Sequence, residues 1–239
     1  MEKKDFIQGA KDGLPIMLGY LAVSFSLGIM VVSDGLSVFQ GALMSLTNVT
    51  SAGEFAGLQI ILASGTLVEM ILTQVIINLR YALMSLSLSQ KIDSSVTLWQ
   101  RLVIAFANTD EIFAVAMNHA KSLTFPYMVG LELFPVLGWT AGTALGSIAY
   151  HLMPESVTTA MNVMLYGMFI AVVLPVAKAK KSVLMVACLS IALSCLFTYV
   201  PFLSFVPAGI VIILCTVIAA AVGSLLFPIS TEEKTEAEV

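Results

Sequence analysis

The sequence predicts an all-α, polytopic membrane protein, and three observations support this prediction. Hydrophobic residues make up 59% of the chain and charged residues only 11%, whereas a soluble domain carries about 25% charged residues. The mean hydropathy is +0.98. The apolar residues also form runs long enough to cross a hydrocarbon core roughly 30 Å thick as helices. We expect a single transmembrane domain over residues 1–230 and an acidic, flexible C-terminal tail at residues 231–239.

About eight hydrophobic segments follow one another along the chain, and seven or eight of them would cross the membrane fully. They run over Leu14–Ser33, Leu36–Ala63, Leu67–Leu88, Leu98–Ala120, Pro126–Tyr150, Val157–Ala177, Ser182–Tyr199 and Leu203–Phe227. Short loops rich in Lys and Arg usually face the cytoplasm. With eight crossings, the basic residues at 3–11 and at 178–181 fall on the same side as the C-terminus. We therefore expect both termini to be cytoplasmic.

The second segment, Leu36–Ala63, is longer than one untilted span and has a polar middle that contains glycine. Such a stretch is tolerated in a membrane where the backbone lines a cavity, and two half-helices that meet near mid-membrane form the substrate site of many secondary transporters. We expect one discontinuous helix here. The alternative is one long tilted helix whose hydroxyl groups bond to their own turn. The expected substrate-binding residues are Asn48, Thr50, Ser51, Gly53, Glu54 and Phe55.

Ionisable side chains inside predicted spans are the next candidates, because a charge at a helix centre costs about 2.5–3.5 kcal/mol on insertion scales. Glu54 lies in the expected break, where a carboxyl group can couple proton entry to substrate movement; alternatively, it caps a half-helix. Asp110 is a second candidate for proton coupling. We expect Arg80 to pair with Asp110 or Glu111. The expected ion-pair and gating residues are Asn78, Arg80, Asp110 and Glu111. The alternative for this pair is a purely structural salt bridge.

A helix-packing face is predicted on the fifth segment. Gly138, Gly142 and Gly146 recur every four residues, and small residues at this spacing let two helices approach closely. The partner is either another helix of this chain or a second subunit.

Several classes of function are disfavoured by the sequence. The three cysteines lie in apolar runs without a Cys-x-x-Cys pair, so we expect no metal site and no disulfide. The chain has no basic patch interleaved with aromatic residues, which makes nucleic acid a poor partner. An intramembrane enzyme would need a constellation of catalytic residues on facing spans, and none is recognisable. We expect no enzyme activity and no cofactor.

Several motifs follow one another along the chain: Gly9-Ala10-x-x-Gly13-x-Pro15-Ile16-x-x-Gly19, Ser51-Ala52-Gly53-Glu54-Phe55-Ala56, Asn78-Leu79-Arg80-Tyr81, Thr109-Asp110-Glu111, Trp139-Thr-Ala-Gly142-Thr-x-x-Gly146 and Met168-Phe169-Ile170-Ala171. This ordered set resembles the AzlC family of branched-chain amino acid permeases. The likeness extends to about Lys180 and weakens in the last two segments. Two positions depart from the pattern: Glu54 stands where the family commonly has Gln, and Tyr81 where it often has His.

The resemblance implies a transporter that exports branched-chain amino acids across a bacterial inner membrane, driven by protons and working with a small AzlD-type membrane subunit. The expected partners are therefore a small amino-acid substrate, protons, that subunit and the lipid bilayer. A rival hypothesis of another class is a non-transporting scaffold that anchors a small membrane partner through the glycine face.

Overall fold

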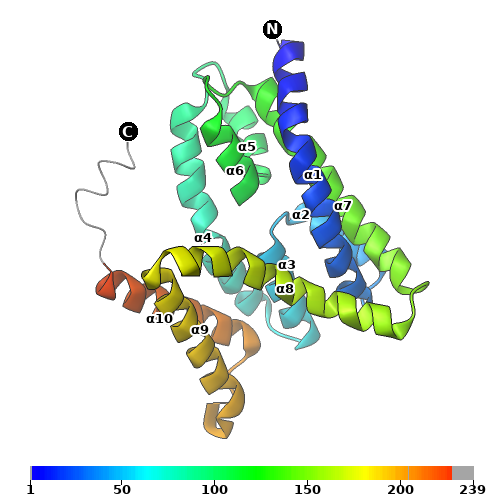
Figure 1. Ribbon diagram of the computed structural model, residues 1–239, viewed down its shortest axis with the longest axis vertical. Helices are drawn as coiled ribbons and strands as arrows, with labels where there is room; N and C mark the ends of the chain where they lie inside the picture. The colour runs from blue at the N-terminus through cyan, green and yellow to red at the C-terminus, as the bar shows by residue number, and fades with distance from the viewer. Residues whose placement is uncertain (1, 204, 228–239) are drawn as a thin grey trace. The chain divides into compact units, whose positions relative to one another are not determined.

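The computed structural model describes residues 2–203 and 205–227, and these residues are almost entirely helical (Figure 1). The helices are α1 (Glu2–Ser33), α2 (Val38–Thr47), α3 (Ser51–Leu62), α4 (Leu67–Lys91), α5 (Leu98–Phe106), α6 (Asp110–Asn118), α7 (Phe125–Tyr150), α8 (Glu155–Ala179), α9 (Lys181–Tyr199), the short 3-10 helix η1 (Pro201–Leu203) and α10 (Ala208–Leu226). Apart from an isolated bridge between Ile92 and Leu123, the described residues contain no strand. The predicted all-α class is confirmed. The expected acidic tail lies outside the described residues.

The eight predicted hydrophobic segments all appear as helices or as pairs of half-helices. Five helices, α1, α4, α7, α9 and α10, are each long and apolar enough to cross a membrane. The expected break in the second segment is present, because α2 ends at Thr47 and α3 begins at Ser51. The fourth segment, expected to be one continuous helix, is broken as well: α5 ends at Phe106 and α6 begins at Asp110.

The chain divides into two compact units, which we describe separately. The first comprises residues 2–58 and 77–168, and the second comprises residues 59–76, 169–203 and 205–227. In the first unit, α1 and α7 lie side by side along most of their length (Figure 1). Helix α7 begins at a capped turn, where Thr124 Oγ1 accepts a hydrogen bond from the backbone N–H of Tyr127 and Pro126 occupies the first turn.

The predicted glycine face of α7 packs against α1. Gly138 lies against Met17, Gly142 against Leu21 and Ser24, and Gly146 against Phe25. The surface of α1 is matched, because a Cβ at Gly28 would collide with the backbone of Thr143. The two backbones approach so closely that the missing side chains are what permits the contact. Of the two partners considered above, the one in contact with this face is therefore a helix of this chain.

A buried apolar cluster fills the space between α7 and the second pair of half-helices. It includes Ile104 of α5, Ile112 of α6, and Met128 and Leu131 of α7, each at most 1% exposed. This cluster fixes α5 and α6 against α7 and thereby positions the break between them.

Asp93, in the loop between α4 and α5, ties this loop to the start of α7. Its Oδ1 accepts hydrogen bonds from Ser95 Oγ (2.7 Å) and Ser95 N (2.9 Å), and its Oδ2 accepts one from Ser122 Oγ (3.2 Å). The hydrogen bonds from the Ser95 side chain and backbone, and then from Ser122, lower the pKa of Asp93 below its ordinary value. The contribution to stability is therefore present above the pKa of the unfolded chain and is lost as the pH falls through the lower pKa of the folded protein.

Replacing this carboxylate should weaken the dependence of stability on acid pH. We expect Asp93→Asn to lower the thermal midpoint of the detergent-solubilised protein at pH 7, and to have a smaller effect at pH 3, where Asp93 is largely protonated in the unfolded chain. Thermal unfolding followed by circular dichroism at the two pH values measures this difference. An equal loss at both values would contradict a role for the ionised carboxyl group.

In the second unit, a buried acidic side chain connects the start of α4 with the start of α10. Glu69, which is 5% exposed, accepts a hydrogen bond at Oε1 from the backbone N–H of Gly209 (2.7 Å). Thr73 donates to the carbonyl oxygen of the same glycine (3.4 Å). Helices α9 and α10 pack together where Gly223 faces Val186, and the described side chains of α9 include no buried one, as expected of a lipid-facing helix.

Candidate functional site

The first helix break is formed by residues 48–50. Helix α2 starts at a capping box, in which the backbone N–H of Ser37 donates to Gln40 Oε1 (2.8 Å) and Ser37 Oγ accepts from the backbone N–H of Gln40 (3.2 Å). The helix ends at Asn48, whose backbone is non-helical (φ −144°, ψ 76°). The side chain of Thr47 donates back to the carbonyl of Leu43 (2.8 Å), which satisfies one of the free carbonyl groups at the helix end.

The second break, at residues 107–109, repeats the pattern of the first. The backbone N–H of Thr97 donates to Gln100 Oε1 at the start of α5 (2.8 Å). Within the break, Thr109 N donates to the carbonyl of Ala107 (2.8 Å), as Thr50 N donates to that of Asn48 (2.8 Å). In sequence, Ser37, Phe39, Gln40 and Asn48 each have a counterpart of the same kind 60 residues later, in Thr97, Trp99, Gln100 and Asn108. The two broken segments are thus internally similar.

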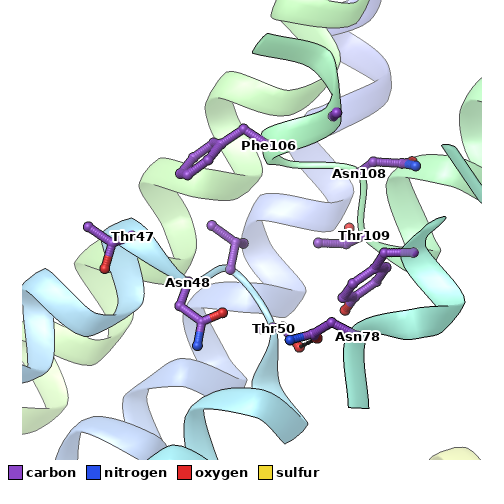
Figure 2. A pocket seen from close by; sticks show the side chains of 10 residues that line it. Thr47, Asn48, Thr50, Asn78, Phe106, Asn108 and Thr109 are labelled. Atoms are coloured by element: carbon purple, nitrogen blue, oxygen red, sulfur yellow. Dashed lines mark hydrogen bonds between the residues drawn. The ribbon is translucent and has the colours of Figure 1, made fainter. Parts of the chain in front are cut away.

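A pocket of about 200 Å³ lies between the two breaks. It is lined by Thr47, Asn48, Val49, Thr50, Asn78, Tyr81, Ala105, Phe106, Asn108 and Thr109. Figure 2 shows Thr47 and Asn48 on one side, Asn78 and Thr109 on the other, and Thr50 beside Asn78. Thr50 Oγ1 donates to Asn78 Oδ1 (3.0 Å) and so joins the first break to α4. The volume is below the roughly 300–1,000 Å³ of sites for drug-sized ligands, so the pocket suits a small solute.

The residues that line the pocket are both polar and apolar, and they include no Asp, Glu, Lys, Arg or His. Asn108 is 4% exposed; its Nδ2 donates to Ser85 Oγ (3.1 Å), whereas its Oδ1 has no hydrogen-bond partner. Such a buried oxygen without a hydrogen-bond partner is uncommon and lowers the free energy of unfolding. The helix ends add partial charges, because the first backbone N–H groups of α3 and α6 and the last carbonyl groups of α2 and α5 have no partner within their own helix.

Glu54 is fully buried and does not line this pocket. Its Oε1 accepts a hydrogen bond from Trp139 Nε1 (2.6 Å) and a longer one from the backbone N–H of Thr50 (3.4 Å), and its Oε2 accepts one from Ser45 Oγ (2.7 Å). Ser45 Oγ in turn lies 2.7 Å from Thr143 Oγ1. The carboxyl group therefore connects α2, α3 and α7 behind the first break.

This hydrogen-bond network can satisfy Glu54 in both protonation states. When the carboxyl group is ionised, Ser45 donates to Oε2. When Oε2 carries a proton, it can donate to Ser45 Oγ, Ser45 can turn to donate to Thr143 Oγ1, and Thr143 already donates to the carbonyl oxygen of Trp139 (3.2 Å). Rotation of the Ser45 hydroxyl group is thus enough to accommodate the change in protonation of Glu54, and no large rearrangement is needed. A hydroxyl group is both donor and acceptor, and this property makes the site able to hold or release a proton.

Arg80 of α4 and Asp110 of α6 are next in sequence to Tyr81 and Thr109, which line the pocket. Arg80 forms an ion pair with Asp110, and the two side chains are 48% and 46% exposed; this is one of the two pairings expected from the sequence. The guanidinium group also lies over the ring of Tyr81, 4.8 Å from its centroid. Glu111 faces elsewhere and accepts a hydrogen bond from the hydroxyl group of Tyr20 (2.5 Å).

Of the expected substrate-binding residues, Asn48 and Thr50 line the pocket, and Ser51, Gly53, Glu54 and Phe55 do not. Gly53 is buried in the first turn of α3 and Phe55 is partly buried. Sequence reasoning missed the contributions of Tyr81, Ala105, Phe106, Asn108 and Thr109 to the lining. The similarity of the two segments 60 residues apart is the signal that would have identified the second break.

Comparison with known proteins shows a family of membrane proteins. A family model described as AzlC protein matches residues 15–153, more than half of the chain. The chain belongs to the AzlC family. An uncharacterised membrane protein of Archaeoglobus fulgidus is 31% identical over 73% of this chain and 77% of its own length. The inner membrane protein YgaZ of Escherichia coli K12 is 26% identical over 79% of this chain and 80% of its own. No solved structure matches the chain significantly.

The family match covers both helix breaks, the Arg80–Asp110 ion pair and the Trp139–Glu54 contact. The pocket is thus formed entirely within the AzlC region of the chain. As a member of this family, the protein is a membrane protein with a transport-related role. Among the residues that the structure describes, no group of three or more His, Cys, Asp or Glu side chains is arranged to hold a metal ion.

Proposed function

We propose that this protein is a secondary transporter that exports branched-chain, or similarly small and apolar, amino acids across the bacterial inner membrane. The observation that carries the proposal is the pocket between two helix breaks in a protein of the AzlC family. Paired half-helices that surround a small polar pocket are the arrangement with which many secondary transporters bind substrate. Transport requires no cofactor and no covalent chemistry.

The chemistry of the pocket suits a zwitterion with an aliphatic side chain. The partial positive charge at the starts of α3 and α6 favours a carboxylate, and the partial negative charge at the ends of α2 and α5 favours an ammonium group. The amides of Asn48, Asn78 and Asn108 add neutral donors and acceptors, so no fixed charge unbalances the site. Val49, Ala105 and Phe106 offer apolar surface, and burying one aliphatic side chain is worth roughly 1.5–3 kcal/mol.

Proton coupling is assigned to Glu54 and the gate to the Arg80–Asp110 pair. Glu54 has hydroxyl partners that accommodate both the ionised and the neutral carboxyl group. Asp110 opens α6 beside the pocket, and its contact with Arg80 connects α6 to α4. Breaking this contact would free both helices to move. Asp110 remains a second candidate to carry a proton when the pair opens.

The remaining elements of the proposal concern the membrane and the partner subunit. The exporter would work with a small AzlD-type membrane protein and would have both termini in the cytoplasm. The rival scaffold hypothesis required the glycine face of α7 as a free surface, and this face is occupied by α1. No other observation favours the scaffold, so transport is the function that we propose.

The pocket amides provide the test of substrate binding. We expect Asn48→Ala and Asn108→Ala to raise the KM for valine or leucine efflux about tenfold or more, because a hydrogen bond to a charged group is worth about 1.5–3 kcal/mol. The matched control is Asn118→Ala; Asn118 is an exposed residue of α6 whose amide bonds only to the carbonyl of Ala114 among the described contacts. Efflux is measured from cells loaded with dipeptides that contain these amino acids, with and without the AzlD-type subunit.

Unchanged efflux on deletion of the protein, in the presence of the small subunit, would contradict transport of these amino acids. Equal KM values for the two pocket variants and the Asn118→Ala control would contradict the location of the site.

A further inference from the structure

Glu54 does not line the pocket, and its hydrogen bond from the backbone N–H of Thr50 connects it only with the first break. Coupling to the second break requires a further connection. The residues that bond to the carboxyl group are Ser45 and Thr50 from the first segment and Trp139 from α7. Of these, Trp139 is the one that also contacts a residue bonded to the second break. Its ring meets that of Tyr20 edge to face, with centroids 5.3 Å apart and an interplanar angle of 74°.

Tyr20 continues this connection from α1 to the pocket. Its hydroxyl group lies 2.6 Å from Thr109 Oγ1, which lines the pocket, and 2.5 Å from Glu111 Oε2, in the first turn of α6. A phenolic hydroxyl group has one proton to donate and can accept another. It can therefore donate to the carboxylate of Glu111 while it accepts from Thr109, and both partners fix its position.

We propose that Tyr20, held by Trp139, is the positioning residue that couples protonation of Glu54 to the second helix break. This inference rests on the proposed function and adds the route by which the proton and the substrate influence each other. Ionised Glu54 holds the Trp139 N–H by a charge-assisted hydrogen bond, which is roughly twice as strong as one to a neutral group. Protonation weakens that bond, releases the indole ring and loosens its contact with Tyr20. The hydrogen bonds of Tyr20 with Thr109 and with Glu111 of α6 then change.

The charged and titratable groups around this route are few. Among the described contacts of Glu54, α2 contributes Ser45, the break contributes Thr50, and α7 contributes Trp139, so no charged side chain faces the carboxyl group. From α1 the nearest titratable group is Tyr20, and from α6 it is Glu111, reached through Tyr20. Glu132 lies on α7 two turns before Trp139, is 4% exposed, and has an oxygen without a partner; it is the one other buried carboxyl group on these helices to be excluded as the source of a titration.

The fluorescence of Trp139 provides a direct readout. The chain has two tryptophans, and Trp99, which is 78% exposed, can be replaced in a Trp99→Phe background. In this background we expect the emission of Trp139 to titrate with pH. The titration should vanish in Glu54→Gln and persist in Glu132→Gln. In an exchange of protons for substrate, saturating valine should move the midpoint to lower pH by about one unit, which corresponds to a tenfold coupling.

Tyr20→Phe then tests the connection itself. It removes the hydroxyl group and keeps the ring against Trp139, so the titration should remain while the shift caused by valine falls to less than 0.3 units, about a twofold coupling. Tyr127→Phe is the matched control: it removes a hydroxyl group that bonds to Asp12 (3.0 Å) across the same pair of helices, away from the pocket. This control should keep the full shift. Binding of radiolabelled valine at fixed pH is measured alongside.

The outcomes separate the two proposals. If the unaltered protein binds valine and Tyr20→Phe keeps the full midpoint shift, the connection through Tyr20 is wrong and the proposed function stands. If the unaltered protein binds none of the small apolar amino acids, the proposed function fails and this inference fails with it. Should Tyr20→Phe not fold, Glu111→Ala, which removes the acceptor of the Tyr20 hydroxyl group from an exposed position, must reduce the shift as well; a full shift there overturns the connection.

Discussion

Glu54→Gln should abolish the pH dependence of efflux while leaving the protein folded. The amide has nearly the shape of the carboxyl group. Its oxygen can accept from Trp139, and its NH₂ group can donate to Ser45, which then donates to Thr143. The variant thus imitates the protonated state permanently. Where proton binding limits efflux, a single site changes the rate by up to about tenfold per pH unit; in the variant this dependence should be absent.

The measurement compares efflux from proteoliposomes across pH 5.5–8.5 with exchange of labelled for unlabelled valine, which needs no net proton movement. We expect exchange to continue in Glu54→Gln and accumulation driven by a proton gradient to stop. Glu132→Gln, which alters another buried carboxyl group of the same unit, is the control and should retain the pH profile. A profile that survives in Glu54→Gln would remove Glu54 from the role of proton carrier.

Gly146→Ala should cause the largest loss of stability from a single added methyl group. A Cβ at this position would overlap the backbone of Phe25 on α1, and a backbone carbonyl cannot move aside as a flexible side chain can. Overpacking of this kind typically costs about 1–3 kcal/mol. We expect a lower thermal midpoint and partial loss of folded protein in detergent. Thermal unfolding measures the first effect and size-exclusion chromatography the second.

Gly19→Ala is the matched control, since Gly19 lies on an exposed face of α1, where a Cβ would meet nothing within 4 Å. This change should be neutral or should raise stability, because glycine inside a helix costs roughly 0.5–1 kcal/mol relative to alanine. If both variants lose the same stability, close packing of α1 on α7 is not what Gly146 provides.

The features that could be predicted from the sequence are those that a membrane makes expensive. Arg80 and Asp110 on neighbouring segments each needed a partner, and they contact each other. The polar stretch around Asn48 could not remain helical against lipid, and the helix is interrupted there. The glycine spacing on α7 indicated a close helix partner, which is α1. In each case a local cost in the sequence indicates that a compensating contact or break must exist.

The second break was missed because its sequence carries a weaker signal. Ala107-Asn108-Thr109 is a short stretch between apolar residues, without the glycine and hydroxyl-rich run that marks the first break. The apolar residues on both sides of it therefore predicted one uninterrupted span over Leu98–Ala120. Comparison of this segment with the one 60 residues earlier contains the missing information, because Asn108 takes the place of Asn48.

The position of Glu54 behind the pocket also could not be predicted. Residues 51–55 follow the break directly, and the sequence does not say which face of α3 turns towards α7. That choice depends on Trp139 and Thr143, more than 80 residues later. The indole N–H of Trp139 bonds to the carboxyl group directly, and the hydroxyl group of Thr143, one helical turn later, contacts its other partner Ser45. Long-range polar contacts of this kind are set by tertiary packing.

Chemical labelling measures whether valine occupies the pocket between the two helix breaks. Thr47→Cys and Ala105→Cys introduce thiols at lining positions on the two segments, in a background where Cys188, Cys195 and Cys215 are replaced by alanine. The account predicts that valine slows labelling of both by a membrane-permeant maleimide and leaves Asn118→Cys, outside the pocket, unaffected. Valine transport without protection at either position would contradict it.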